Sequence, residues 1–133
     1  MSAAVAALIY DTGGKLLLTY RAHEPGKGKL DLPGGFVDSG EDANTALIRE
    51  IMEELNLEVT DSKYSSSYPN EYIYGGIIYF TLDLVFVCQV ASFEAISPAD
   101  DVNGFIFMEP KSINLEDIGL HSVKSIIRSL QLL

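Results

Sequence analysis

Short runs of apolar residues, separated by turn-forming residues, divide this chain into segments that predict strands. Runs rich in β-branched and aromatic residues and bounded by glycine, proline, asparagine or aspartate are typical of strands. Such runs lie at residues 5–10, 16–20, 30–32, 58–67 and 104–108, and residues 77–90 contain at least one long strand. Residues 11–14 provide hairpin turn residues. Residues 21–29 are expected to form a loop, because Pro25, Gly26 and Gly28 interrupt any regular pattern.

Two other segments have the spacing of amphipathic helices. At residues 42–55, apolar residues fall on one arc of a helix: Ala43, Leu47, Ile51 and Leu55. Near the C-terminus, Val123, Ile126, Ile127 and Leu130 follow an i, i+3, i+4, i+7 pattern, with Ser122 as the candidate N-cap. Strands on both sides of one helix, followed by more strands and a last helix, predict an α/β fold with a mixed sheet between helices.

Length and composition set the outer limits. The chain has 133 residues, of which 47% are hydrophobic, so residues 1–133 are expected to form one domain with an ordinary core. Nine basic and nineteen acidic residues give a net charge of −10, which argues against a nucleic-acid partner. A small anionic ligand would need bound cations. The only cysteine, Cys88, lies in an apolar run and is expected to be buried and inert.

The N-terminal apolar segment predicts neither secretion nor a membrane anchor. No basic residue precedes the apolar residues 2–10, and polar turn residues soon follow them. No run approaches the length of a transmembrane helix. We therefore expect a cytoplasmic protein with no membrane partner.

Residues 49–54 place three carboxylates on adjacent turns of the first predicted helix. Glu50 and Glu53 are spaced i, i+3, and Glu50 and Glu54 are spaced i, i+4, so all three side chains project to one side. Like charges at this spacing repel one another unless a cation lies between them. Hard oxygen ligands suit Mg²⁺ or Mn²⁺ better than zinc. The competing interpretation is an ordinary charged, solvated helix face.

The residues before this helix complete a longer motif. Leu32-Pro33-Gly34-Gly35 predicts a tight turn where backbone can approach a ligand, and no Gly-Lys-Ser/Thr follows to make it a P-loop. The complete order is Gly35, five residues, Glu41, seven residues, Arg49-Glu50, Ile51, one residue, Glu53-Glu54, one residue, Asn56 and Leu57. This order resembles the Nudix box, the signature of the Nudix hydrolases. Asn56 stands where the family usually has glycine, but asparagine tolerates the left-handed conformation that closes a helix.

This resemblance implies a Nudix α/β/α sandwich and a specific chemistry. In the family, water attacks phosphorus in a nucleoside diphosphate linked to another moiety, and bound Mg²⁺, for which Mn²⁺ can substitute, assists cleavage of the pyrophosphate bond. The implied metal ligands are Glu53 and Glu54, with the Gly35 carbonyl, while Glu50 is a ligand or the general base. Arg49 would orient the glutamates, although a plain surface ion pair is the alternative.

Three further acidic residues are candidates for the site, although they lie outside the cluster at residues 50–54. Glu41 is expected to hold the glycine turn or an outer metal. Asp100 and Asp101 are candidates for the additional acid that many family members carry on a later loop, against ordinary solvated loop acids.

Tyr68, Tyr72 and Tyr74 follow three serines in a segment expected to contain a turn, and they are candidate substrate-binding residues. Their rings suit stacking on a purine or nicotinamide, which favours an NADH- or ADP-ribose-like substrate; otherwise they are core residues. The sequence leaves two other functions open: a nucleoside triphosphate pyrophosphatase, and a module that binds a nucleotide without cleaving it. It also leaves a homodimer open.

Overall fold

A computed structural model describes residues 2–133, apart from the side chain of Tyr72, a candidate substrate-binding residue that therefore lies outside the described part. The strands are β1 (Ser2–Ile9), β2 (Leu16–Arg21), β3 (Leu30–Asp31), β4 (Gly34–Phe36), β5 (Val59–Tyr74), β6 (Ile77–Val90) and β7 (Val102–Met108). The helices are α1 (Ala43–Leu55) and α2 (His121–Gln131), and two short 3₁₀ helices, η1 (Pro110–Ser112) and η2 (Leu115–Asp117), precede α2.

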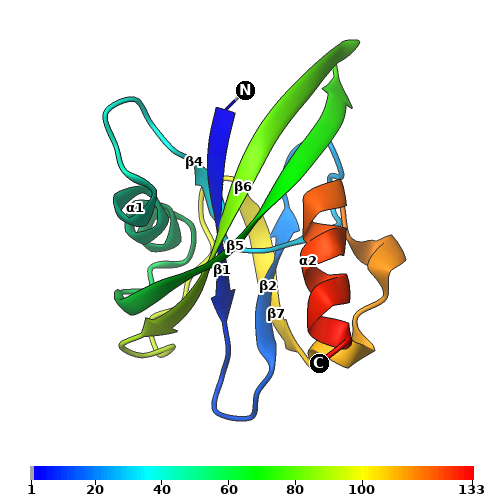
Figure 1. Ribbon diagram of the computed structural model, residues 1–133. Coiled ribbons are helices and arrows are strands. Elements are labelled where there is room, and N and C mark those ends of the chain that lie inside the picture. Colours follow the sequence, from blue (N-terminus) through cyan, green and yellow to red (C-terminus); the bar gives the residue numbers. More distant parts are fainter. Residues whose placement is uncertain (1) are drawn as a thin grey trace.

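The strands form two sheets that lie between the helices. The order of one is β4-β1-β6-β5 and that of the other is β3-β2-β7. The pairing of β1 with β6 is parallel and the other pairings within the sheets are antiparallel, so the first sheet is mixed. Helices α1 and α2 lie on opposite sides of these sheets (Figure 1). The predicted α/β class, with a mixed sheet between helices, is therefore confirmed.

The core consists of two apolar clusters, one under each helix. In β1, Ala7 and Ile9 belong to the cluster under α1, whereas Ala6 and Leu8 belong to the cluster under α2. Successive side chains of a strand point to opposite faces, so a strand buried on both faces needs an unbroken apolar run. Cys88 is also buried in the α1 cluster, as expected.

Helix α1 begins and ends with local capping contacts. The Asp42 side chain accepts a hydrogen bond from the Thr45 amide at 2.8 Å. At the other end Asn56 adopts the left-handed conformation, with φ of 55°, and its amide donates to the Met52 carbonyl. The expectation that Asn56 closes the helix in place of glycine is confirmed.

Three local expectations were wrong. The turn expected around Gly34 is instead the short strand β4, which pairs with β1; a Cβ on Gly34 would lie 1.9 Å from the Val5 carbonyl oxygen, so only glycine allows this approach. Residues 68–74 contain no turn, because β5 continues to Tyr74 and the chain reverses at residues 75–76. Ser122 does not cap α2; Leu120 is the N-cap, and Ser122 is buried inside the first turn.

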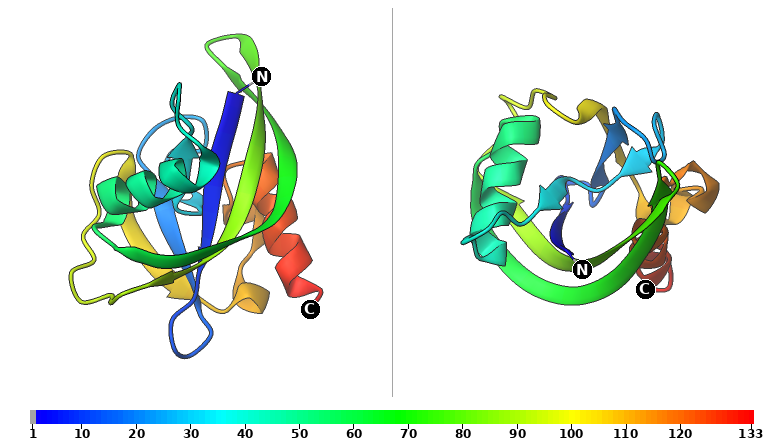
Figure 2. Two further views of the ribbon diagram at one scale, coloured as in Figure 1. Left: turned by 60° about the vertical axis from the view of Figure 1, so that its left-hand side comes forward. Right: turned by 90° about the horizontal axis from the view of Figure 1, so that it is seen from above.

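The hairpin of β5 and β6 is the longest feature of the fold and curves around one side of the molecule (Figure 2). Its inner face, together with β1 and β4, forms one wall of a cavity. Within residues 2–133 no helix is long and apolar enough to cross a membrane.

Candidate active site

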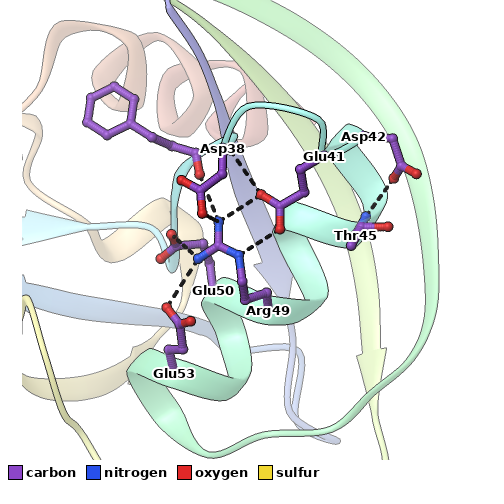
Figure 3. A network of polar contacts seen from close by, with 8 residues as sticks. Asp38, Glu41, Asp42, Thr45, Arg49, Glu50 and Glu53 are labelled. Atoms are coloured by element: carbon purple, nitrogen blue, oxygen red, sulfur yellow. Dashed lines mark hydrogen bonds and ion pairs between the residues drawn. The ribbon is translucent and has the colours of Figure 1, made fainter.

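Arg49 is the centre of a carboxylate network on α1 (Figure 3). Its guanidinium binds both oxygens of Glu41, with Nε–Oε2 at 2.7 Å and Nη2–Oε1 at 2.9 Å. Nη1 donates to Glu50 at 3.0 Å and to Glu53 at 3.2 Å. Nη2 also donates to the Phe36 carbonyl, which ties α1 to the end of β4. Arg49 therefore contacts two of the three predicted helix ligands, Glu50 and Glu53, and does not line the cavity.

Glu41 acts as the partner that fixes Arg49. It also accepts a hydrogen bond from the Asp38 amide, so the loop before α1 folds back onto the helix. Bonding to Arg49 is the main cause that lowers the pKa of Glu41 to about 2. The structure gives Glu41 a place beside the loop, away from the cavity wall.

Glu54 is the most deeply buried of the helix carboxylates. Its residue is 7% exposed, and its Oε1 accepts a hydrogen bond from the Gly34 amide at 3.0 Å. Burial, with the neighbouring charges of Asp31, Glu50 and Asp101, raises the pKa of Glu54 to about 8. A carboxylate in this position lacks a compensating positive charge from the described residues.

Glu50 lies directly over the backbone of Gly35. A Cβ on Gly35 would be 2.5 Å from the Glu50 carboxyl carbon, so glycine is required for this contact. Burial also raises the pKa of Glu50. The Gly35 backbone and the carboxylates of Glu50 and Glu54 thus meet where β4 packs against α1.

A cavity of about 800 Å³ opens beside these groups. Glu50, Glu54, Gly35 and Asp101 line it, whereas Glu53, Asp100 and Tyr68 do not. The Glu53 side chain is 46% exposed and binds the same Arg49 nitrogen, Nη1, as Glu50.

The other candidate residues lie in the loop before β7 and on β5, and only some of them line the cavity. Asp101 pairs with His23 at 3.3 Å, and both side chains are largely exposed. Tyr74 lines the cavity, while Tyr68 packs in the cluster under α2, and its hydroxyl lies 3.4 Å from Ser129 Oγ.

The donor set at this end of the cavity fits a hard divalent cation. No group of three acidic, histidine or cysteine side chains among residues 2–133 is arranged to hold one ion, since Arg49 holds Glu50 and Glu53 while Gly34 holds Glu54. The carboxylates of Glu50 and Glu54 are nevertheless oxygen donors that line the same cavity, and Mg²⁺ prefers such donors. A cation there would also offset the cost of burying Glu54.

Sequence reasoning missed several polar residues of the cavity. Arg21 pairs with Asp31 on its wall, and Asn70 and Asp83 also line it. One sequence signal could have identified Asp83, because it is the only charged residue in the apolar run 77–90. A lone carboxylate in a strand that is otherwise apolar needs either a buried partner or a ligand.

Comparison with known proteins gives consistent matches. Residues 2–128 match the NUDIX domain family. The chain is 47% identical over 49 residues to an ADP-ribose pyrophosphatase of Methanocaldococcus jannaschii, covering 37% of this chain and 29% of that protein. It is 38% identical over 76 residues to a CTP pyrophosphohydrolase of Escherichia coli, covering 56% of each. These alignments span about a third to about a half of the relatives' lengths.

The fold also resembles those of solved Nudix hydrolases. A MutT NUDIX hydrolase from Burkholderia pseudomallei superposes with a TM-score of 0.80 at 19% identity, covering 96% of this chain and 95% of that one. At this identity the likeness concerns the fold alone.

Proposed function

The chain belongs to the Nudix family, and we propose that it is a divalent-metal-dependent hydrolase that cleaves the pyrophosphate bond of a small nucleotide derivative. One observation carries this proposal. Glu54 is buried, uncompensated and next to Glu50 and Gly35 at the edge of a cavity large enough for a nucleotide. A solvated helix face would leave these carboxylates exposed to water. The burial of Glu54 therefore argues against the alternative that residues 49–54 form an ordinary solvated helix face.

The chain's own residues divide the work. Glu50, Glu54 and the Gly35 carbonyl would hold Mg²⁺ or Mn²⁺, and Glu53 would join them by rotating away from Arg49. A bound ion supplies positive charge to the phosphate oxygens and lowers the pKa of water. Arg49 and Glu41 fix the orientation of the ligands. Asp101, at the cavity wall, is the candidate additional acid.

The substrate enters this proposal as a nucleoside diphosphate linked to another moiety, as in NADH or ADP-ribose. Tyr74, Tyr79 and Phe36 line the cavity, so aromatic surface is available for more than one ring system. Arg21 is the one arginine or lysine among the described cavity-lining residues and is placed to offset phosphate charge. A (deoxy)nucleoside triphosphate pyrophosphatase is the second candidate, which the similarity to a CTP pyrophosphohydrolase favours. A cytoplasmic location remains a prediction.

A phosphate-release screen of the purified chain with Mg²⁺ tests the proposal. NADH, ADP-ribose, other nucleoside diphosphate derivatives and nucleoside triphosphates are compared, with a phosphatase added to detect product monophosphates. We expect turnover of at least one class, and faster turnover of the diphosphate derivatives. Nucleotide binding without turnover of any substrate would instead identify a binding module that does not cleave.

A further inference from the structure

A second polar cluster lies in the cavity, below the start of α2. It consists of Asn70 on β5, Thr81 and Asp83 on β6, and Ser122 on α2, which are 4%, 4%, 7% and 0% exposed. Asn70 and Thr81 are directly paired across the hairpin, and Asp83 is two residues further along the strand. These three side chains therefore point to the same face of the sheet. All three residues line the cavity, whereas Ser122 does not.

The two polar atoms of the Asn70 side-chain amide differ in their hydrogen bonding. Its Oδ1 accepts a hydrogen bond from the Ser122 amide at 3.1 Å, and this bond fixes the orientation of the side chain, since an amide nitrogen cannot accept. Within the described residues, nothing accepts a hydrogen bond from Asn70 Nδ2. No buried side-chain nitrogen or oxygen of the described residues lacks a hydrogen-bond partner, so this nitrogen is open to the cavity that Asn70 lines. Its two N–H groups are therefore available to a ligand in the cavity.

Asp83 supplies acceptors beside these donors. Its Oδ1 accepts from the Thr81 hydroxyl at 3.0 Å, and its Oδ2 accepts from the Ser122 hydroxyl. Among the described residues, no lysine, arginine or histidine forms an ion pair with it. Each carboxylate oxygen has lone pairs beyond the one already used. The cavity wall thus presents donors from Asn70 next to acceptors from Asp83.

We propose that Asn70 and Asp83 recognise the edge of a nucleobase in which an exocyclic amine adjoins an unprotonated ring nitrogen, as in cytosine and adenine. This inference rests on the proposed function and names the base that the substrate carries. Asp83 accepts from the exocyclic amine, and the Asn70 amide donates to the ring nitrogen. Leu120, which precedes α2, and Val123 of α2 line the same cavity and offer apolar surface to the flat face of the base.

Uracil and hypoxanthine present the opposite pattern at the same positions. Their carbonyl oxygen would face the Asp83 carboxylate, and their ring N–H would face the Asn70 amide. To form both hydrogen bonds, uracil would have to move along the cavity wall until its ring N–H faced Asp83 and its next carbonyl faced Asn70. This movement would also displace the attached ribose. A good pair of hydrogen bonds of this kind discriminates between bases by about tenfold or more.

Neutral nucleosides test base recognition without any chemistry at phosphorus. The purified chain, labelled with ¹⁵N and kept in EDTA, is titrated with cytidine, uridine, adenosine and inosine, and the side-chain amide resonances of Asn70 are followed by NMR. We expect cytidine to bind at least about tenfold more tightly than uridine, adenosine to bind more tightly than inosine, and both preferred nucleosides to shift the Asn70 amide signals. Equal affinities within each pair, or no binding of any nucleoside, would overturn the proposal. Hydrolysis in the phosphate-release screen is independent of this result.

Three variants separate recognition from the anchoring of α2. Asp83→Asn should abolish the preference for cytidine over uridine, because an amide can donate to a carbonyl as well as accept from an amine. Asn70→Asp keeps the acceptor for the Ser122 amide but removes the donors, so cytidine binding should fall at least tenfold; Asn103→Asp, on the exposed side of β7, is the charge-matched control. Ser122→Ala removes only the bond to Asp83 and should lower the melting temperature with the preference intact. If folded Asp83→Asn and Asn70→Asp proteins keep the wild-type preference, the cluster is only an anchor for α2.

Discussion

Glu54 is a buried acidic residue whose charge is unfavourable for the fold and which we propose as a metal ligand. Its hydrogen bond to Gly34 does not offset the burial of its charge, as the pKa of about 8 indicates. A buried carboxylate without a cation destabilises a protein, and natural sequences retain such groups mainly at functional sites. The same residue makes a sharp test of the proposed metal site.

Glu54→Gln should lower kcat by at least about a hundredfold and leave the metal-free protein as stable as the wild type or more stable. Glutamine keeps the acceptor for the Gly34 amide but removes the buried charge, and loss of a charge-stabilising group has effects of this size. Steady-state kinetics and thermal melting in EDTA measure both quantities. Glu58→Gln, at an exposed position, is the matched control. Near-normal turnover of Glu54→Gln would assign the glutamates to the fold alone.

At the level of secondary-structure elements, the Arg49 network links the loop before α1 to the helix itself. Glu41 and Asp38 precede α1, and their contacts with Arg49 pin the loop against the middle of the helix. The pKa of Glu41 lies below its ordinary value of 4.5, at about 2. Its contribution to stability is therefore fully present above pH 4.5 and is lost as the pH falls toward 2.

Glu41→Gln should consequently melt below the wild type at pH 7, and this difference should shrink as the pH is lowered from about 5 to 3. Circular dichroism melts across this range provide the measurement. Glu94→Gln, an exposed glutamate in the loop before β7, should show no such pH-dependent difference. A difference that stays constant down to pH 3 would mean that the Glu41 charge does not stabilise the loop.

The C-terminal cap of α1 gives a second test at this scale. Asn56 has a φ of 55°, a conformation that costs most L-residues about 1–2 kcal/mol. Asn56→Ala should therefore lower the free energy of unfolding by about 1 kcal/mol, whereas Asn56→Gly should be close to neutral. Glycine also lacks the bond from Asn56 Nδ2 to the Ala95 carbonyl, so it serves as the control for that contact. Urea unfolding of both variants decides the matter, and equal losses would attribute the effect to the hydrogen bond.

The elements that could be predicted from the sequence are those whose formation depends on residues close together in the chain. Helix α1 follows from its apolar spacing, from Asp42 at its start and from Asn56 at its end, all of which are local. Strand β4 could not be predicted, because two glycines form a strand there only by lying against β1, a long-range contact. The same holds for Asn70 and Asp83, whose meeting depends on the register of β5 with β6 and on the docking of α2.

The charge of the whole molecule bears on how it binds an anionic substrate. The net charge is −10, and Glu50, Glu54, Asp31 and Asp101 gather on one cavity wall. A nucleotide would be repelled from such a wall at low ionic strength. Divalent cations would reverse the local sign, and they would also relieve repulsion among the carboxylates of the folded protein.

Mg²⁺ should therefore both support turnover and raise the melting temperature of the wild-type chain. A ligand that binds only the folded state stabilises it by about 2.7 kcal/mol when its concentration is a hundred times its dissociation constant. Differential scanning fluorimetry in EDTA, then with increasing MgCl₂ or MnCl₂, measures the shift, and NaCl of equal ionic strength controls for general screening. Glu54→Gln should lose most of the shift, because it lacks a ligand, while Glu58→Gln should keep it. Full activity after exhaustive chelation, or an equal shift from NaCl, would show that the acidic wall does not bind a metal and would leave the raised pKa of Glu54 as a property of the fold alone.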